Sequence, residues 1–593
     1  MNVSEFIFDY LSKKGIDTAF MVTGGQAMWL NDAIGKNGNY SIICTHHEQS
    51  AAMSADAYGR INNKPSVVLV TAGPGAINAL NGVVGGYTDS SPMIVISGQA
   101  ALPFVKYQEK TGIRQYGVQG IYIKNIVEHI VKYFVTIDDP QKTKYYLEKA
   151  LFEATSERPG PVWIEVPLDI QNAQIDIKYL EEYVNINNKD FGKIKQTVKY
   201  TYNEINKAKK PVFLVGQGVK LAGANEVFSN FINKIRIPVL TSRLGIDLIE
   251  SNNDLYVGRP GNYGERSANF AIQNSDLVIS VGCRLASSLV GHNAKEFGKN
   301  AKIICIDIDK NELDKPGPII DYKANIDCKD FFETMMEELD NNSVPSFDNW
   351  IARCNSWKNK YPVVLDEYKK DNPINSYYFL DRLSFMAKDN AAIMIDTGSC
   401  FHVACQTWKI KKGQKFLTTG GISSMGYWAA CLGACIANGK QETIVVTGDG
   451  SFQMNIQELA TIKHNNLPIK IFIIDNDGYL LIRHTQRNFM NDRFIGEGPD
   501  TGVWCPDSIK VAEAYGIKAV SINGPEEIDN KIKEVLNYDG PVLCNVKCSK
   551  WQLLIPRITS DRLPDGTLKS RNYEDMYPFL SEEELKANMS DEQ

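Results

Sequence analysis

The chain of 593 residues lacks the features that would place it in a membrane or on nucleic acid. Its apolar runs are of strand length, and none approaches the roughly 20 residues that a membrane-spanning helix needs. Lys and Arg number 64 against 70 Asp and Glu, so the net charge of -6 leaves no basic surplus for binding phosphates. We therefore expect neither a membrane nor a nucleic acid among its partners.

The 12 cysteines are scattered, and no Cys-x-x-Cys pair occurs. Cys544 and Cys548 stand close together, but no cluster of histidines accompanies them, which argues against a zinc site. Scattered cysteines of this kind are typical of reduced thiols in a cytoplasm. The first 14 residues lack a basic start followed by an apolar run, so we expect no secretory signal peptide and a cytoplasmic location.

What the chain does contain is three long segments of one type, each alternating β-branched runs with helical patterns. Such alternation is typical of α/β domains built on doubly wound parallel sheets. We predict three of these domains, at residues 1–184, 196–341 and 374–550, followed by a C-terminal tail at 551–593. The predicted strands are residues 41–44, 66–71, 93–97 and 162–166, then 212–215, 239–241, 277–281 and 303–306, then 392–395, 443–447, 469–474 and 542–546.

The remaining segments are expected to connect or extend these domains. Polar stretches at residues 185–195 and 341–346 are predicted linkers, and residues 4–14 are predicted to form a helix capped by Ser4. The tail carries three prolines and ends in acidic residues. We expect it to be an irregular wrap with a solvated, mobile end.

The strongest local signal lies where two neighbouring strands of the third segment end. One strand runs into Gly448-Asp449-Gly450, and the next is followed by Asn476 and Gly478. A carboxylate, an amide oxygen and a backbone carbonyl suit Mg²⁺, which shares its coordination shell with phosphates. The glycines let the backbone approach a phosphate, and the next helix adds oriented N–H groups. Each piece alone is better explained as a tight turn. Together, each after a strand and at this separation, they favour a metal and diphosphate site.

At this site the chain resembles the superfamily of acetolactate synthases and pyruvate decarboxylases, whose motif is Gly-Asp-Gly followed, one strand later, by Asn. The resemblance implies that thiamine diphosphate (ThDP) and Mg²⁺ bind here, with Ser451 and Tyr479 beside the diphosphate. One position departs from the pattern, because the family has Asn-Asn where this chain has Asp475-Asn476. The ligand is the second of the two, so we expect the metal site to survive, while the extra carboxylate is unexplained.

A second group of residues, near the N-terminus, matches the part of the family that contacts the aminopyrimidine ring of the cofactor. A predicted strand runs into His46-His47-Glu48-Gln49, and a small-residue helix over residues 51–58 follows. A glutamate in a first helical turn is also explained by the helix dipole. In the family the matching glutamate hydrogen-bonds N1′ of the ring and promotes its imino tautomer, a role we assign to Glu48. For His47, contact with substrate and a structural role remain equal alternatives.

Three further segments resemble parts of the family's active site: the pair Gly24-Gly25, the turn Gly73-Pro74 with Asn78, and the pair Val118-Gln119.

Met425 matches the family's bulky residue that lies under the cofactor and keeps its two rings bent. A methionine of the core is the alternative interpretation. In this superfamily the pyrimidine end and the diphosphate end of the site come from different subunits. The resemblance therefore implies a homodimer or a homotetramer.

The family decarboxylates a 2-keto acid such as pyruvate and passes the two-carbon unit to a proton or to a carbonyl acceptor. Two selectors of a second 2-keto acid are missing, because Thr485 replaces the family's Trp and Ser288 its Arg. Arg483 offers a replacement cation, although a surface charge is the alternative. Residues 478–486 are more similar to acetolactate synthase-like proteins of surface-polysaccharide clusters, which resemble the yersiniose-pathway carboligase.

We therefore predict a carboligase that transfers the unit to a carbonyl acceptor, such as a nucleotide-linked ketosugar. An acetolactate synthase of branched-chain amino-acid synthesis is the first alternative. A simple decarboxylase or lyase is the second, disfavoured because residues 106–123 lack the paired histidines of pyruvate decarboxylases. A non-catalytic cofactor-binding protein would need a broken motif, whereas Glu48, Asp449 and Asn476 are intact.

FAD is an open question for the middle segment. Acetolactate synthases bind FAD there, and residues 258–264 and 282–284 fit a surface that contacts a dinucleotide. Residues 286–288 lack the charged side chains usual in the family. FAD is therefore kept as one of two alternatives.

Overall fold

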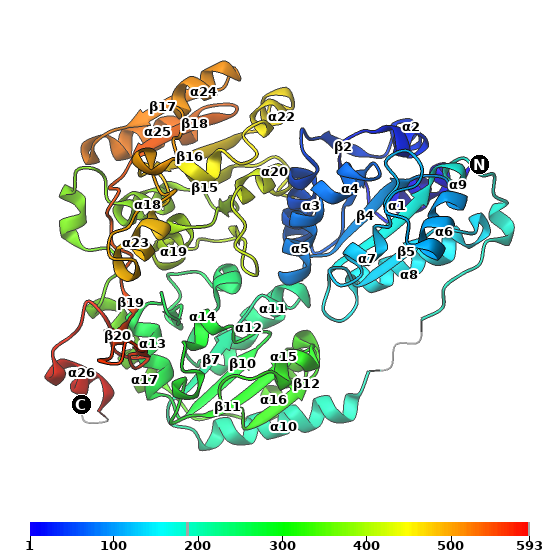
Figure 1. The fold of residues 1–593 in the computed structure, drawn as a ribbon. Helices are drawn as coiled ribbons and strands as arrows, with labels where there is room; N and C mark the ends of the chain where they lie inside the picture. Colours follow the sequence, from blue (N-terminus) through cyan, green and yellow to red (C-terminus); the bar gives the residue numbers. More distant parts are fainter. Residues whose placement is uncertain (186–188, 591–593) are drawn as a thin grey trace.

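A computed structural model of the protein describes residues 1–185 and 189–590, and it contains three six-stranded sheets in which all paired strands are parallel. Helices flank each sheet (Figure 1). The predicted class of three doubly wound parallel α/β sheets is thereby confirmed. The helices of the described chain are too short or too polar to cross a membrane.

The first sheet has the strand order β2-β1-β3-β4-β6-β5. Helix α1 begins after Asn2, whose side chain accepts from the backbone N–H of Glu5, so the predicted cap at Ser4 is wrong. The Ser4 hydroxyl instead donates to the Gln171 carbonyl. The elements are α1 (Val3–Lys13), β1 (Thr18–Met21), α2 (Met28–Lys36), β2 (Ser41–Cys44), α3 (Glu48–Asn62), β3 (Val67–Val70), α4 (Pro74–Asn78), α5 (Leu80–Thr88), β4 (Met93–Gln99), α6 (Leu102–Thr111), α7 (Lys124–Val127), β5 (Tyr133–Thr136), α8 (Thr143–Thr155), β6 (Pro161–Pro167) and α9 (Leu168–Gln171).

The second sheet has the order β12-β11-β10-β7-β8-β9. Helix α10 begins at Phe191, inside the predicted linker at 185–195, of which residues 186–188 lie outside the described residues. The elements are α10 (Phe191–Lys207), β7 (Pro211–Val215), α11 (Gly218–Leu221), α12 (Asn225–Ile235), β8 (Val239–Thr241), β9 (Tyr256–Gly258), α13 (Arg266–Asn274), β10 (Leu277–Val281), α14 (Ser287–Val290), β11 (Lys302–Asp307), α15 (Lys310–Asp314), β12 (Tyr322–Asn325), α16 (Cys328–Asn341) and α17 (Asp348–Lys360).

The third sheet has the order β14-β13-β15-β16-β18-β17. Its elements are α18 (Ser376–Met386), β13 (Ala392–Ile395), α19 (Ser399–Thr407), β14 (Lys415–Thr418), α20 (Cys431–Ala437), β15 (Thr443–Gly448), α21 (Asp449–Phe452), α22 (Glu458–His464), β16 (Ile469–Asp475), α23 (Leu480–Phe489), α24 (Ser508–Ala514), β17 (Lys518–Ile522), α25 (Ile528–Asn537) and β18 (Val542–Lys547).

The described part of the tail returns to the central domain. Its short strands β19 (Arg557–Ile558) and β22 (Met576–Tyr577) pair with each other, as do β20 (Ser560–Arg562) and β21 (Leu568–Ser570). Helix α26 (Glu582–Met589) packs Leu585 and Met589 on the central core, and Asn588 accepts a hydrogen bond from the Trp357 indole at 3.1 Å. For the described part of the tail, the expected solvated, mobile end is therefore wrong. Residues 591–593 lie outside the described residues.

Each outer sheet divides its side chains between two apolar layers. In β3, Val67 and Leu69 join one layer while Val68 and Val70 join the other. Strand β13 alternates in the same way between its two layers. Such two-sided burial is the reason parallel strands read as continuous apolar runs. Burying one such side chain contributes about 1.5–3 kcal/mol.

The first and third domains of one chain touch through α3 and α20, which lie side by side in Figure 1. The backbones approach so closely that a Cβ added to Gly433 would lie 1.8 Å from the Ser54 carbonyl oxygen. Met53 and Ala57 of α3 enter the same apolar cluster as Trp428 and Cys431. The α3–α20 contact therefore requires glycine at position 433.

We expect Gly433→Ala to lower the free energy of unfolding by about 1–3 kcal/mol, because the added methyl group overpacks the α3–α20 contact. Gly35→Ala is the matched control, since Gly35 lies in helix α2 with no atom near its missing Cβ. Alanine there is expected to be neutral or to stabilise by about 0.5–1 kcal/mol. Urea unfolding of both variants measures these two effects. Equal urea midpoints for Gly433→Ala and Gly35→Ala would contradict the packing argument.

Candidate active site

The predicted metal ligands meet at the carboxyl edge of the third sheet. Strands β15 and β16 run side by side there, with Gly448 opposite Ile474. The Asp449 carboxylate accepts from the backbone N–H groups of Gly450 at 2.8 Å and Gly478 at 2.9 Å. The structure thus brings the Gly-Asp-Gly turn and the Asn476 loop together, as parallel strands ending at one edge require.

Two features of this edge fit a divalent cation. The Asn476 side-chain oxygen is buried without a hydrogen-bond donor. Burial raises the pKa of Asp449 to about 6; the N–H groups of Gly478 and Gly450 oppose the rise, and Asp475 and Asp477 add to it. A cation would partner the orphaned amide oxygen and favour the ionised carboxylate. The described residues contain no group of three or more His, Cys, Asp or Glu side chains that could hold a metal ion by themselves, so phosphate oxygens or water would have to complete the shell of a Mg²⁺ ion.

Asp475, which replaces the family's first Asn, is committed to the neighbouring strand. Its carboxylate lies 3.1 Å from the Lys547 ammonium and accepts from the Asn545 amide at 3.0 Å. Asp475 and Lys547 are direct partners in the β16–β18 register. The extra carboxylate is therefore explained by a cross-strand ion pair that fastens the end of β16.

Of the residues predicted beside the diphosphate, Gly448 faces open space, whereas Gly450 and Ser451 contact other parts of the protein. A Cβ added to Gly448 would meet open space, so the backbone there can approach a ligand closely. A Cβ on Gly450 would lie 2.2 Å from the Tyr479 ring, so this glycine serves the packing of Tyr479. The Ser451 hydroxyl donates to Asp396 at 2.6 Å and accepts from the Gly426 N–H at 2.8 Å. Ser451 is thus tied into the protein.

Asp396, at the end of β13, is a residue that the sequence analysis missed. Its buried carboxylate accepts from Ser451, from Thr447 at 2.8 Å and from the Thr397 N–H at 2.8 Å. Asp396 is followed by Thr397-Gly398, which open helix α19. The same pattern of strand, Asp and Gly that identified Asp449 was present here and could have pointed to it.

The loop that carries Met425 is anchored from two sides. The Asp89 carboxylate of the first domain accepts from the N–H groups of Gly420 at 2.8 Å and Gly421 at 2.7 Å. At the other end, the Gly426 N–H donates to Ser451. Met425 is half-buried between these anchors. Its role under the cofactor stays a prediction, since the structure fixes only the loop.

Asp89 belongs to a buried charged network between the first and third domains. The Arg60 guanidinium lies 3.7 Å from both Asp56 and Asp89. It also donates to the Thr418 carbonyl at 2.8 Å and to the Tyr427 hydroxyl at 3.1 Å. Tyr427 in turn donates to Asp56, whose pKa burial raises. The network joins α3 to the segment that leads into the Met425 loop.

Glu48 lies at the start of α3 and is buried. Its carboxylate accepts from the Asn78 amide at 3.0 Å. A Cβ added to Gly75 would lie 3.2 Å from the other carboxylate oxygen. A helical turn that begins at Pro74 therefore places Asn78 and a small residue against Glu48.

The other predicted residues of this end gather around the same turn. Gly73 has φ +62°, and a Cβ there would lie 2.6 Å from the Gln119 carbonyl. A Cβ on Gly24 would lie 2.5 Å from Thr71, whose hydroxyl accepts from the Gln26 N–H at 3.2 Å. Gly25 follows Gly24 with open space at its Cβ position. Thr71 was not singled out from the sequence, because an isolated threonine at a strand end carries no motif.

His47 caps helix α3. Its Nδ1 accepts from the Gln49 N–H at 3.1 Å, which leaves the proton of the neutral ring on Nε2. The structural role is therefore present, while contact with substrate stays a prediction. The preceding His46 N–H donates to the Glu458 carboxylate at 3.1 Å, a second link between the first and third domains.

Arg483 is neither a surface charge nor a group aimed at an acceptor. Its side chain is 3% exposed, and it donates to the carbonyls of Asn476 and Asp477. The suggestion that it replaces the family's acceptor-binding Arg is therefore wrong. Thr485 is exposed, and its hydroxyl donates to the Leu481 carbonyl of its own helix.

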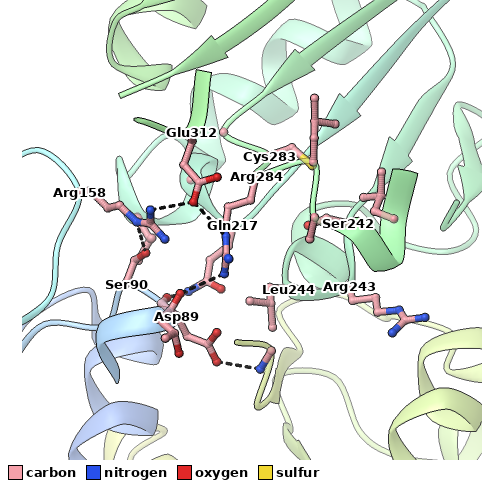
Figure 2. A pocket seen from close by; sticks show the side chains of 18 of the residues that line it. Asp89, Ser90, Arg158, Gln217, Ser242, Arg243, Leu244, Cys283, Arg284 and Glu312 are labelled. Carbon is pink, nitrogen blue, oxygen red and sulfur yellow. Dashed lines mark hydrogen bonds and ion pairs between the residues drawn. The ribbon is translucent and has the colours of Figure 1, made fainter. Parts of the chain in front are cut away.

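A cavity of about 600 Å³ lies between the central sheet and the two outer domains. Figure 2 shows Arg158 and Arg284 on one side of it, both engaged with Glu312. Ser288 and residues 282–284 line the cavity, whereas loop 258–264 contributes only Pro260. Thr397 and Gly398 also line it, so the cavity reaches the third domain.

Arg243 differs from the other two arginines of this wall. One of its terminal nitrogens is buried without a hydrogen-bond partner, and the guanidinium lies 4.9 Å from the centre of the Phe401 ring. An unpaired buried charge is costly. Among the described residues no carboxylate pairs with Arg243, so this wall of the cavity contains a cation without a counter-ion.

Three family models match the chain in order: the N-terminal thiamine pyrophosphate binding domain over residues 1–126, the central domain of these enzymes over 198–335, and the C-terminal binding domain over 396–546. Thiamine pyrophosphate is ThDP under its other name. Fold and site thus define a ThDP-dependent enzyme.

The relatives narrow this class. The probable acetolactate synthase large subunit of Methanococcus aeolicus is 32% identical over 564 residues, which cover 92% of this chain and 91% of the relative. The acetolactate synthase large subunit of Cyanidium caldarium is 31% identical, covering 91% of each chain. The large subunit of acetolactate synthase isozyme 2 from Escherichia coli is 28% identical, and the match covers 95% of this chain and 99% of the relative.

The chain belongs to the acetolactate synthase-like family of ThDP enzymes, which form carbon–carbon bonds from small keto acids. The resemblance inferred from the motifs is confirmed. The narrower placement near the yersiniose-pathway carboligase is not confirmed by these relatives.

Asp307 ends strand β11 in the cavity wall, and burial raises the pKa of its carboxyl to about 6, with the Asp309 N–H opposing the rise. Ionisation therefore costs more in the folded than in the unfolded chain, and stability is lost as pH rises through about 4 to 6. This loss reaches about 3 kcal/mol at pH 7 and about half of that at pH 5.

We expect Asp307→Asn to raise the urea midpoint at pH 7, because the amide accepts the same bond without ionising. The gain should shrink at pH 5. An equal gain at both pH values would show that the carboxyl does not titrate as described.

Proposed function

We propose that this protein is an acetolactate synthase, which decarboxylates pyruvate and joins the two-carbon unit to a second 2-keto acid, either pyruvate or 2-ketobutyrate. The observation that carries the proposal is the similarity to acetolactate synthase large subunits over more than 90% of the chain. The buried Glu48 and the orphaned oxygen of Asn476 support it, because this chemistry requires a buried carboxyl group and an oxygen ligand for a metal.

When bound, ThDP supplies the nucleophilic carbon and the electron sink that decarboxylation needs. Glu48, oriented by Asn78, would hydrogen-bond N1′ of the pyrimidine ring and share a proton there. Its neighbours at this end of the cofactor would be Gly24, Gly25, Gly73, Pro74 and Gln119.

At the diphosphate end, Asp449 and Asn476 would hold Mg²⁺ through their side chains and Gly478 through its carbonyl. Gly448 and Gly450 would allow close approach of the phosphates, with Ser451 and Tyr479 beside them. Met425 would lie beneath the two rings.

We expect Glu48→Gln to keep its affinity for ThDP within a few-fold while turnover falls by about 10²–10⁴, the contribution typical of a general acid–base group. The amide still reaches the ring but cannot exchange a proton. Calorimetric titration with ThDP and product formation from pyruvate measure the two effects. Full activity in this variant would contradict the role of Glu48, and lost ThDP binding would make its role structural.

We further propose that the enzyme is a homodimer or a homotetramer in which the Glu48 end of one subunit faces the Asp449 end of another. Large apolar side chains are exposed near both ends: Val118 is 72% exposed beside Gln119, and Ile495 and Trp504 are 75% and 73% exposed after α23. Such groups are typical of surfaces that bind a partner. A closed twofold assembly would cover both surfaces at once.

The second candidate function is transfer to a nucleotide-linked ketosugar. It is favoured by Thr485 and Ser288, which remove two selectors of a second keto acid, and by a cavity that reaches from the central sheet to Thr397 and Gly398. Arg243 suits either acceptor, because a keto-acid carboxylate and a sugar-nucleotide diphosphate are both anions. We propose that it contacts that anion.

The enzyme is incubated with pyruvate alone and then with pyruvate and a panel of nucleotide-linked 4-ketosugars. Mass spectrometry of the products separates these functions. Acetolactate from pyruvate alone supports the synthase, whereas a sugar carrying an added two-carbon unit supports the second candidate. Acetaldehyde alone would make the protein a decarboxylase.

We expect Arg243→Met to divert product from the ligated compound to acetaldehyde by about tenfold or more, because it weakens the hold on the acceptor alone. Arg158→Met is the control, since Arg158 is already paired with Asp309 and Glu312. An unchanged product ratio in Arg243→Met would remove Arg243 from the acceptor site.

FAD remains a proposal for the same cavity, where Gly282 follows strand β10 and Asp307 ends the neighbouring parallel strand β11. Flavin absorbance of the purified protein tests it. Bound flavin would occupy the space that a nucleotide-linked acceptor needs, so the two are alternatives.

A cytoplasmic location is likewise proposed, supported by the 12 cysteines, all of them unpaired.

A further inference from the structure

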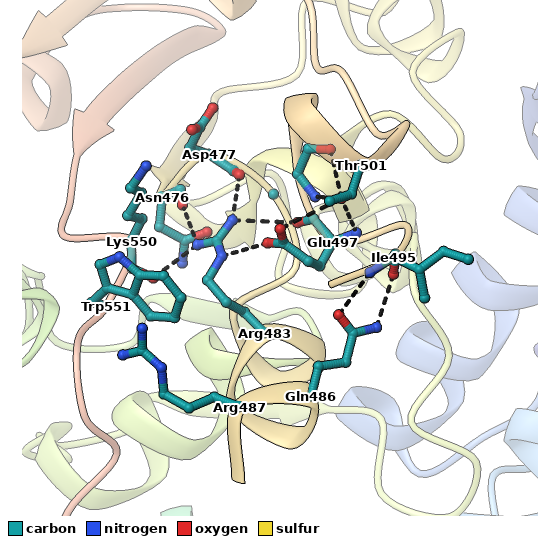
Figure 3. A network of polar contacts seen from close by, with 12 residues as sticks. Asn476, Asp477, Arg483, Gln486, Arg487, Ile495, Glu497, Thr501, Lys550 and Trp551 are labelled. Carbon is teal, nitrogen blue, oxygen red and sulfur yellow. Dashed lines mark hydrogen bonds and ion pairs between the residues drawn. The ribbon is translucent and has the colours of Figure 1, made fainter. Parts of the chain in front are cut away.

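The metal loop, residues 476–478, is bound from below by one buried guanidinium. Arg483 lies in the first turn of α23, and it donates to the Asn476 carbonyl at 3.1 Å and to the Asp477 carbonyl at 2.6 Å. Figure 3 shows these bonds converging on the guanidinium from the loop above it. Two consecutive carbonyls are therefore turned toward α23.

The other donors of Arg483 bind outside this loop. It donates to the Glu497 carboxylate at 2.5 Å, to the Glu497 carbonyl at 3.3 Å and to the Lys550 carbonyl at 2.8 Å. With the two loop carbonyls this makes five acceptors, which equals the number of N–H donors that a guanidinium has. Arg483 thus has no donor left for a substrate.

Glu497 also contacts the metal loop directly through its backbone. Its carbonyl accepts from the Tyr479 N–H at 2.7 Å, and a Cβ added to Gly478 would lie 2.1 Å from that oxygen. Thr501 in turn accepts from the Glu497 N–H at 3.0 Å. The loop is therefore held between α23 and the segment that carries Glu497.

The conformation of the loop needs this support. Asp477 has φ +63° and Gly478 φ +118°, both in the left-handed region that costs energy for a residue with a side chain. Such a backbone persists only where its surroundings overdetermine it. The Asn476 carbonyl is used by Arg483, which leaves the Asn476 side-chain oxygen as the group presented at the sheet edge.

The geometry points to Arg483 and Glu497 as a clamp that positions the metal loop, so that the Asn476 amide oxygen and the Gly478 carbonyl face the cation together. The inference rests on the proposed metal site. Because the two residues carry opposite charges, the clamp fixes the loop without adding a net charge that would compete with the cation. Lysine cannot replace the arginine, since a single ammonium lacks the planar fork that reaches both carbonyls.

The test compares Arg483→Lys with Arg487→Lys in the full-length protein. Arg487 is the matched control, because it lies one turn further along α23 and stacks on the same Trp551 ring, but it pairs with Asp492 away from the metal loop. Mg²⁺ is titrated calorimetrically in the presence of ThDP, and the Mg²⁺ concentration for half-maximal activity is measured beside it.

We expect Arg483→Lys to weaken Mg²⁺ binding by about 10–100-fold, as for other residues that orient metal ligands, with turnover restored at high Mg²⁺. Arg487→Lys should change neither quantity by more than about twofold. If Arg483 had only a structural role, the variant would yield less folded enzyme, and added Mg²⁺ would not restore its turnover.

Arg483→Lys leaves Glu497 with a poorer partner, so the variant Arg483→Met/Glu497→Gln, which removes both buried charges, is measured as well. It is expected to show the same weakening with the folded content, checked by circular dichroism, retained. Folded variants that bind Mg²⁺ as tightly as the wild type would contradict the proposed clamp but leave the proposed metal site unaffected. A wild type that binds no Mg²⁺ with ThDP would overturn both, and Asp449→Asn distinguishes binding at this site from binding elsewhere.

Discussion

The buried network of Arg60 with Asp56 and Asp89 is the interaction on which the position of the Met425 loop and the contact between the first and third domains depend. It crosses the boundary between the first and third domains, where α3 already packs closely on α20. Removing one partner from such a network costs about 3–5 kcal/mol, because the other charge stays buried. Asp89 also holds the N–H groups of Gly420 and Gly421, so the loop that carries Met425 takes its position from a residue of another domain.

At the carboxyl edge of the third sheet, polar groups are either committed to the protein or left without a partner. Ser451, Asp475 and Arg483 all bond to neighbouring elements. The Asn476 oxygen and, in the cavity beyond, Arg243 are not satisfied by the protein. Because buried polar groups are normally paired, these are the two groups to which we propose that a cation and an anion bind. The committed groups hold the open ones in place.

Much of the fold could be predicted from the sequence, because strands buried on both faces read as apolar runs. Every predicted strand exists, among them β8, β10 and β13 with the predicted limits. The strands that were not predicted include both edges of the second and third sheets. Half-exposed residues interrupt the apolar pattern in β12 and β17, whereas β9 is buried but only three residues long. Helix α1 was predicted with the wrong cap, since Asn2 and Ser4 are both good capping residues and only the contact with Glu5 separates them.

The sequence by itself determined the cofactor class, because Glu48, Asp449 and Asn476 stand in local motifs at strand ends, and the parallel strands of the third sheet bring Asp449 and Asn476 to one edge. Tertiary structure alone decided what the neighbouring charges do. Asp475 is paired through Lys547, and Arg483 is committed through Glu497, while Arg243 is left open over Phe401. The physical reason is that a polar side chain is free or committed according to partners far away in the chain, which a local motif does not contain.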